Sequence, residues 1–139
     1  MPTPEYVRAA TYVALISGAR GILYFSYHFE NHNLKQSVLW EPLGRLNAEI
    51  AQLAPGLLAS EPKPVETSDK RVIAATFAGD DGLIMLAANK SEAEAVDAEL
   101  HLPGVRGEAR WLFEDTTAPC EEKVTIHLPP YGTAAFFVQ

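Results

Sequence analysis

The hydrophobic pattern changes after Pro64, and this change constrains the fold more than any other feature of the sequence. Beyond it, apolar residues no longer recur every three or four positions. Short aliphatic and aromatic runs recur instead about every ten residues, at 71–78, 83–89, 95–102, 108–114, 123–128 and 133–138, with a weaker run at 65–68. Turn residues separate these runs, as is typical of antiparallel strands. The sequence therefore predicts an antiparallel β-sandwich domain over residues 61–139.

The first sixty residues carry a different pattern, which predicts a helix, a strand and a second helix. Residues 6–17 are apolar on almost every side, as in a helix packed on more than one face. The run 21–29 is continuously apolar and aromatic, as in a parallel strand covered on both faces. Residues 38–60 form a helix whose apolar stripe steps by three or four: Leu39, Leu43, Leu46, Ile50, Leu53 and Leu57. Pro55 is expected to break or kink this helix.

Charge divides the chain at the same place as the pattern. Residues 61–64 contain two prolines and predict a stiff linker between two parts, 1–60 and 61–139. The first part is electrically balanced, and the second holds the whole net charge of −7. An acidic chain argues against nucleic acid or an anionic membrane as a partner. We see neither a membrane-spanning run nor the basic-then-apolar order of a signal peptide at the start.

Few residues suit cofactor or metal chemistry, so we expect neither a cofactor nor a metal. The lone Cys120 excludes an internal disulfide, and its acidic neighbours make it a poor nucleophile. His28, Glu30 and His32 are spaced two apart, but they lie where the chain becomes a polar loop. The sequence contains neither a glycine-rich phosphate loop nor a nucleophile elbow.

Three segments resemble a known enzyme class. They are RAATYVALISGARGILYFSY (8–27) followed by Trp40, then LNAEIAQLAPGLL (46–58), and the terminal LPPYGTAAFFVQ (128–139). Together they resemble the end of a (β/α)8-barrel glycoside hydrolase of the β-galactosidase and related β-glycosidase type. The match would comprise the last barrel helix, strand and helix, followed by a small C-terminal β domain. The terminal segment is also similar to the last strand of amylase-type enzymes. The resemblance thus implies an α+β chain with an incomplete barrel tail and a β-sandwich domain.

This resemblance implies a chain without a catalytic pair. A complete barrel needs about 250 residues. In such enzymes the two catalytic carboxylates follow the fourth and seventh strands, which would lie upstream of Met1. We therefore expect a C-terminal fragment or short derivative of a glycoside hydrolase that does not hydrolyse glycosides alone. A stand-alone carbohydrate- or protein-binding module and an inactive remnant are the alternatives.

The resemblance also suggests where a sugar would bind. It places Tyr27, His28 and Trp40 at the carboxyl end of the last barrel strand, where barrel enzymes gather their sites. For Tyr27 and Trp40, packing in the core is an equally good interpretation. Glu41 and Glu49 do not pair convincingly as acid and base. The apolar helix and the two open edges of the strand predict a partner, either a second copy or the missing barrel portion.

Overall fold

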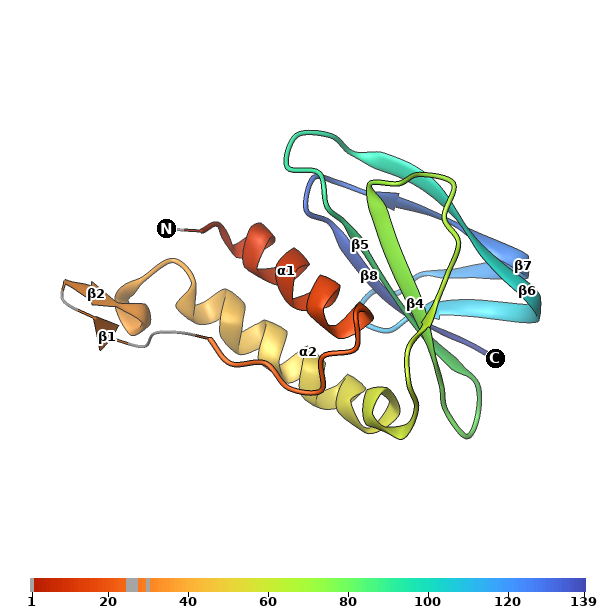
Figure 1. The fold of residues 1–139 in the computed structure, drawn as a ribbon, viewed down its shortest axis with the longest axis horizontal. Coiled ribbons are helices and arrows are strands. Elements are labelled where there is room, and N and C mark those ends of the chain that lie inside the picture. The colour runs from red at the N-terminus through yellow and green to blue at the C-terminus, as the bar shows by residue number, and fades with distance from the viewer. Residues whose placement is uncertain (1, 25–27, 30) are drawn as a thin grey trace.

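Two helices cover one face of an antiparallel sheet in the computed structural model, which describes residues 2–24, 28–29 and 31–139. Helix α1 (Pro4–Ile16) and helix α2 (Trp40–Ala59) lie against the same face of the sheet, as Figure 1 shows. The short hairpin of β1 (His28–Phe29) and β2 (His32–Asn33) projects from the end of the molecule opposite the sheet. The chain is therefore α+β, and its helices and sheet pack as one body.

Both helices form where the apolar periodicity predicts them. The Thr3 side chain caps α1 by accepting a hydrogen bond of 3.2 Å from the Tyr6 amide, and Pro4 occupies the first turn. The stripe of α2 is buried at Leu43, Leu46, Leu53 and Leu57. None of the described helices is long and apolar enough to cross a membrane.

Helix α2 does not end at Pro55 but continues to Ala59. Proline removes one backbone donor near the end of the helix. Burial of Leu57 against the sheet keeps the last turn in place. At Gly56 the helix comes so close to β5 that an added Cβ would collide with the Ile84 side chain. The helix is thus not broken at Pro55, and a kink there stays a prediction.

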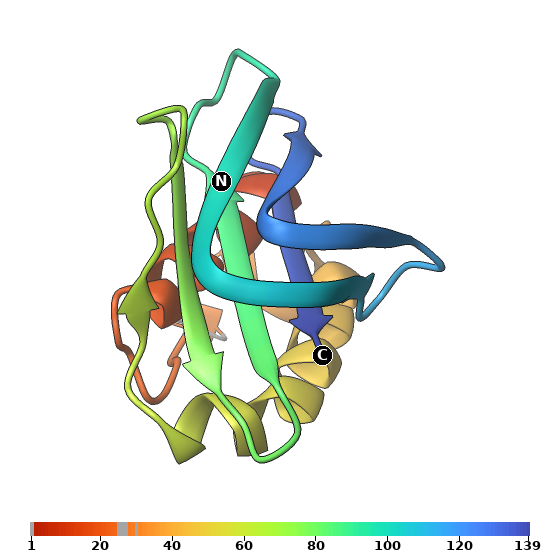
Figure 2. The same cartoon turned by 90° about the vertical axis from the view of Figure 1, so that its right-hand side faces the viewer.

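All strands from residue 63 onward belong to one antiparallel sheet in the order β3-β4-β5-β8-β6-β7. Their bounds are β3 Lys63–Pro64, β4 Val72–Ala78, β5 Leu83–Asn89, β6 Val96–Trp111, β7 Thr117–Leu128 and β8 Thr133–Val138. This agrees with the predicted antiparallel strands. The predicted two-sheet sandwich differs from the result, since a single sheet curls over itself, as Figure 2 shows.

The curl comes from a bend within β6 and β7. The sequence divides this region into two runs, 95–102 and 108–114, but β6 continues through Pro103 and Gly104 and is 16 residues long. The pairing of β6 with β7 shifts register between His101 and Arg106, and Gly104 has φ 77°. A bulge bends a strand without ending its pairing. The far halves of β6 and β7 therefore fold over the sheet instead of starting a second one.

The predicted buried strand over 21–29 is wrong for the residues that the structure describes there. Residues 21–24 are not in a strand, and Leu23 is 93% exposed. Residues 25–27 lie outside the described residues, and His28 pairs only with Asn33 in the short hairpin. A parallel strand is held by neighbouring strands on both sides. The described part of this chain offers no such neighbours, so the structure does not confirm the barrel-tail arrangement of helix, strand and helix.

Candidate functional site

The two predicted sugar-contacting residues that the structure describes, His28 and Trp40, lie toward the hairpin end of the molecule. Tyr27 lies outside the described residues. His28 is described as part of β1, and Trp40 is the first residue of α2, with 43% of its surface exposed. A short 3-10 helix, η1 (Leu34–Gln36), connects the hairpin to α2. The chain path therefore brings His28 and Trp40 to the same end of the molecule (Figure 1).

Local hydrogen bonds shape the connection between the hairpin and α2. The Asn33 side chain accepts a bond of 3.0 Å from the Lys35 amide and so caps η1. The Ser37 hydroxyl donates to the Leu34 carbonyl at 2.7 Å and accepts from the Leu39 amide at 3.2 Å. Asn and Ser are favoured at such positions because their short side chains reach nearby backbone groups. These contacts hold the chain in a defined path up to Trp40.

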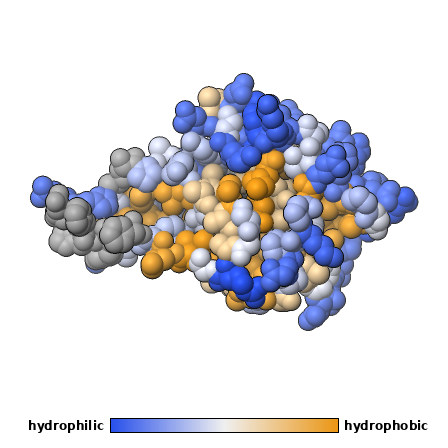
Figure 3. Space-filling model, in the orientation of Figure 1, coloured by the Kyte–Doolittle hydropathy of each residue, from blue (hydrophilic) through white to orange (hydrophobic). Residues whose placement is uncertain are grey.

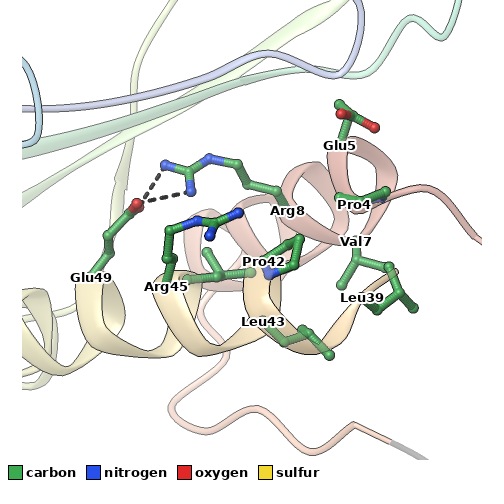
Figure 4. Close-up of a pocket in the computed structure, with 10 residues that line it drawn as sticks. Pro4, Glu5, Val7, Arg8, Leu39, Pro42, Leu43, Arg45 and Glu49 are labelled. Atoms are coloured by element: carbon green, nitrogen blue, oxygen red, sulfur yellow. Dashed lines mark hydrogen bonds and ion pairs between the residues drawn. The ribbon is translucent and has the colours of Figure 1, made fainter. Parts of the chain in front are cut away.

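A groove of about 300 Å³ lies between α1 and the first half of α2. Figure 4 shows its apolar wall, made by Pro4, Val7, Leu39, Pro42 and Leu43, and its charged side chains, Glu5, Arg8, Arg45 and Glu49. The charges balance to zero. The groove therefore presents an apolar wall beside two acids and two arginines.

Arg8 and Glu49 form a two-pronged ion pair in this groove. The Nη1 and Nη2 atoms of Arg8 donate to Oε1 and Oε2 of Glu49 at 3.1 and 2.5 Å, as the dashed lines in Figure 4 mark. Arg8 Nε also donates to the Thr133 hydroxyl at 2.7 Å. Burial alone would lower the pKa of Arg8, but its contacts with Glu49 and Tyr12 outweigh burial and raise it. The pair thus links α1, α2 and β8.

Tyr12 is fully buried beneath this ion pair. The Arg8 guanidinium lies 5.3 Å from the centre of the Tyr12 ring. Burial raises the pKa of the Tyr12 phenol to about 12, so the hydroxyl stays neutral at ordinary pH. No hydrogen-bond partner of good geometry reaches this hydroxyl from the residues that the structure describes. The cluster fits a structural link better than acid–base chemistry, because Arg8 occupies both oxygens of Glu49.

The acids and the cysteine outside the cluster also suit structural roles. Glu41 is exposed and lies 3.9 Å from Arg45 one turn later in α2. Cys120 is buried, and burial raises the pKa of its thiol, which disfavours the reactive thiolate. Within the described ranges, no three His, Cys, Asp or Glu side chains gather closely enough to hold a metal ion.

Sequence reasoning missed the Arg8–Glu49 link. It excluded Glu49 only from an acid–base pair, whereas the structure pairs this residue with Arg8. The two residues are 41 positions apart. No local pattern signals such a pair, because the contact exists only once α1 and α2 lie side by side.

Known structures share this fold. The alpha-amylase from Geobacillus thermoleovorans, complexed with acarbose, aligns over 99% of this chain with a TM-score of 0.70 and 14% identity, and 34% of the amylase chain is covered. AmyP E221Q, in complex with maltotriose, aligns over 98% with a TM-score of 0.65 and 15% identity, and 35% of it is covered. A cyclomaltodextrinase aligns over 98% with a TM-score of 0.64 and 15% identity, and 26% of it is covered. The chain therefore spans about a third or less of these structures.

Sequence comparisons add no closer relative: neither a family model nor a curated protein matches the sequence. At such low identity, the structural likeness establishes the fold and leaves the activity open.

Proposed function

We propose that this chain is the C-terminal part of a glycoside hydrolase of the alpha-amylase type. The observation that carries the proposal is that both helices and the sheet together, 99% of the chain, align with 34% of an alpha-amylase. The acid and the nucleophile would then lie in a barrel portion that precedes this chain. The neighbouring structures favour the amylase type over the β-galactosidase type that the sequence suggested.

In this proposal the two parts of the chain have different roles. Residues 1–60 supply helices of the barrel portion, and residues 61–139 are the accessory sheet domain that packs on them. The shared core beneath α1 and α2 supports the packing of the sheet on the helices, because it joins helix residues to residues of β4, β5 and β8. Side chains that line a rigid sheet face hold helices in one orientation.

Several exposed apolar residues are consistent with a surface that a partner covers. Leu23, Val38 and Leu58 are exposed to 93%, 72% and 48%. Figure 3 shows hydrophobic residues exposed over the helices, whereas the margin around the sheet is mostly hydrophilic. Covering large apolar side chains contributes about 1.5–3 kcal/mol each. The proposed partner is the missing barrel portion, with self-association as its substitute when the chain is alone.

The carbohydrate contact is proposed at Tyr27, His28 and Trp40. The neighbours AmyP E221Q and AmyP are described in complex with maltotriose and maltose. An exposed indole suits a sugar because the apolar face of a pyranose stacks on an aromatic ring. A stand-alone carbohydrate-binding module is the second candidate, and the exposed Trp40 favours it equally.

The chain's two tryptophans provide a test of this contact. Trp111 is stacked on Phe136, with the ring centres 4.9 Å apart, so Trp111→Phe is the matched control. We expect maltotriose to change the fluorescence of the Trp111→Phe variant, and Trp40→Phe to lose the response. If maltotriose still changed the fluorescence of Trp40→Phe as it changes that of the unaltered chain, the contact at Trp40 would be contradicted.

Two further measurements test the fragment. The isolated chain should not hydrolyse maltooligosaccharides or aryl glycosides, and robust turnover would overturn the proposal. The DNA upstream of Met1 separates the candidates. A barrel-coding sequence in frame with this chain supports the fragment, whereas a ribosome-binding site there supports the stand-alone module.

A further inference from the structure

A second cleft, of about 460 Å³, lies between α2 and the sheet. Three of its residues come from adjacent strands in register: Ile84 of β5 opposes Phe137 of β8, and Phe137 opposes Arg110 of β6. Directly opposed residues of antiparallel strands point to the same face of a sheet. Ile84, Phe137 and Arg110 therefore form one row across three strands, on the face that α2 covers.

The floor of this cleft is apolar and aromatic. Leu112 and Phe113, just beyond the end of β6, line it together with Leu53 of α2 and the Ile84–Phe137 pair. The tip of the Phe137 ring lies close to the Gly82 backbone, because an added Cβ at Gly82 would come within 2.7 Å of the Phe137 Cζ atom. Leu112 and Phe113 pack on the helix-side core. The floor is thus fixed by packing before any ligand arrives.

Polar side chains surround this floor. Gln52 comes from α2, Asp81 from the turn between β4 and β5, and Arg110 from β6. All three are exposed. Within the described part of the chain, these three side chains make neither a hydrogen bond nor an ion pair. The cleft therefore combines an aromatic floor with a carboxylate, a guanidinium and an amide whose bonding capacity is unused.

We propose that this cleft binds a neutral oligosaccharide. The apolar face of a pyranose suits the aromatic floor, and its hydroxyls can both accept bonds from Arg110 and donate them to Asp81. The charges of Asp81 and Arg110 offset each other, so the cleft has no net preference for an anion or a cation and suits a neutral, hydroxyl-rich ligand. The volume lies within the range of about 300–1,000 Å³ that small-molecule sites occupy. The choice of a glucan as ligand rests on the proposed function.

The cleft is separate from the proposed contact at Tyr27, His28 and Trp40. Gln52 follows Trp40 by twelve residues on the same helix. At about 1.5 Å per residue, the two positions are about 18 Å apart along the axis of α2. A single residue change in one site therefore leaves the other intact.

A nuclear magnetic resonance titration of the whole chain with maltotriose tests the cleft. We expect saturable shifts at the amides of Gln52, Asp81 and Phe113. Phe113→Leu keeps an apolar side chain in the core and removes the flat ring, and Arg110→Gln removes the charge. Each should weaken binding at these amides about fivefold or more, since one lost contact of this kind costs about 1 kcal/mol. Arg106→Gln, on the same strand but outside the cleft, should leave the affinity unchanged.

The outcomes separate this inference from the proposed function. Chemical shift changes confined to the region of Trp40 would overturn the proposed binding in the cleft and support the proposed contact at Trp40. Cleft shifts that persist in Trp40→Phe would support the cleft, even if the Trp40 contact fails. Absence of saturable shifts at the cleft amides, or affinities that Phe113→Leu and Arg110→Gln leave unchanged in well-dispersed spectra, would overturn the proposal.

Discussion

The sheet separates two hydrophobic cores that are built in different ways. The core on the concave face consists of side chains from residues 65–138 only, with Met85, Leu100 and Phe136 fully buried at its centre. The core on the other face combines α1 and α2 with β4, β5 and β8. The first core is closed by the curl of β6 and β7, whereas the second exists only where helices cover the sheet. The comparison teaches that the helices depend on the sheet more than the sheet depends on them.

The hydrophobic patterns of the strands differ according to whether one or both faces are covered. In β5, Met85 and Ala87 face the concave core while Leu86 and Ala88 face the helices, so the strand is apolar from Leu83 to Ala88. In β6, the buried residues Val96, Ala98, Leu100 and Leu102 alternate with Asp97, Glu99 and His101, which are polar and at least partly exposed. A strand covered on both faces has no polar alternation, and one covered on a single face has it. The same rule misled the interpretation of residues 21–24, where Ile22 and Tyr24 are only partly buried against the helix-side core and Leu23 is exposed.

The largest expected effect comes from removing the centre of the concave core. Phe136→Ala should lower the free energy of unfolding by about 3–5 kcal/mol, because it empties a fully buried site and unstacks Trp111. Leu53→Ala, in the helix-side core, should cost about 2–5 kcal/mol. Urea unfolding measures both losses. Hydrogen exchange then sharpens the comparison: Leu53→Ala should expose the amides of α2 while those of β6 and β7 stay protected, and equal loss of protection would contradict it.

Two glycines of α2 test how closely the helix approaches the sheet. Gly56→Ala should cost about 1 kcal/mol, because the new methyl group collides with the Ile84 side chain. Gly44→Ala, whose added Cβ meets nothing within 4 Å, should instead stabilise the protein by about 0.5–1 kcal/mol. Thermal unfolding measures both. Adding Ile84→Val to Gly56→Ala removes the colliding methyl group and should restore stability, and a double variant less stable than Gly56→Ala would argue against a close contact.

Protonation of Asp69 at low pH should lower the free energy of unfolding. Hydrogen bonds from Arg71 lower the pKa of Asp69 to about 2, whereas an unfolded Asp has a value of about 3.9. A lowered pKa stabilises the fold above the unfolded value, and this contribution is lost as the pH falls from about 4 to about 2. Asp69→Asn should therefore flatten the pH dependence of urea unfolding in this window. Asp80→Asn, in the turn between β4 and β5, is the control and should leave the wild-type slope.

The smallest effect is expected at Leu23. Because this side chain is 93% exposed, Leu23→Ser should change the free energy of unfolding by less than about 0.5 kcal/mol. A loss above about 2 kcal/mol, measured by urea unfolding, would mean that residues 21–24 are buried after all. Light scattering on the same variant also tests the exposed apolar face, since reduced self-association would support its role as a contact.

The sequence by itself determined the elements of this protein more than their arrangement. The stripe of α2 and the strands from residue 72 onward follow from local periodicity and turn residues, which act over a few positions. Trp40 and His28 were likewise chosen from sequence, and their contact with sugar stays a prediction.

Only the tertiary structure decided which elements meet. The curl of β6, the Arg8–Glu49 pair and the row of Ile84, Phe137 and Arg110 each join residues far apart in the chain. The tertiary structure also determines that residues 21–24 are not in a strand. An apolar run becomes a buried strand only where neighbouring strands and helices cover it. Periodicity states which side of an element avoids water, and the partner that covers that side is a property of the whole fold.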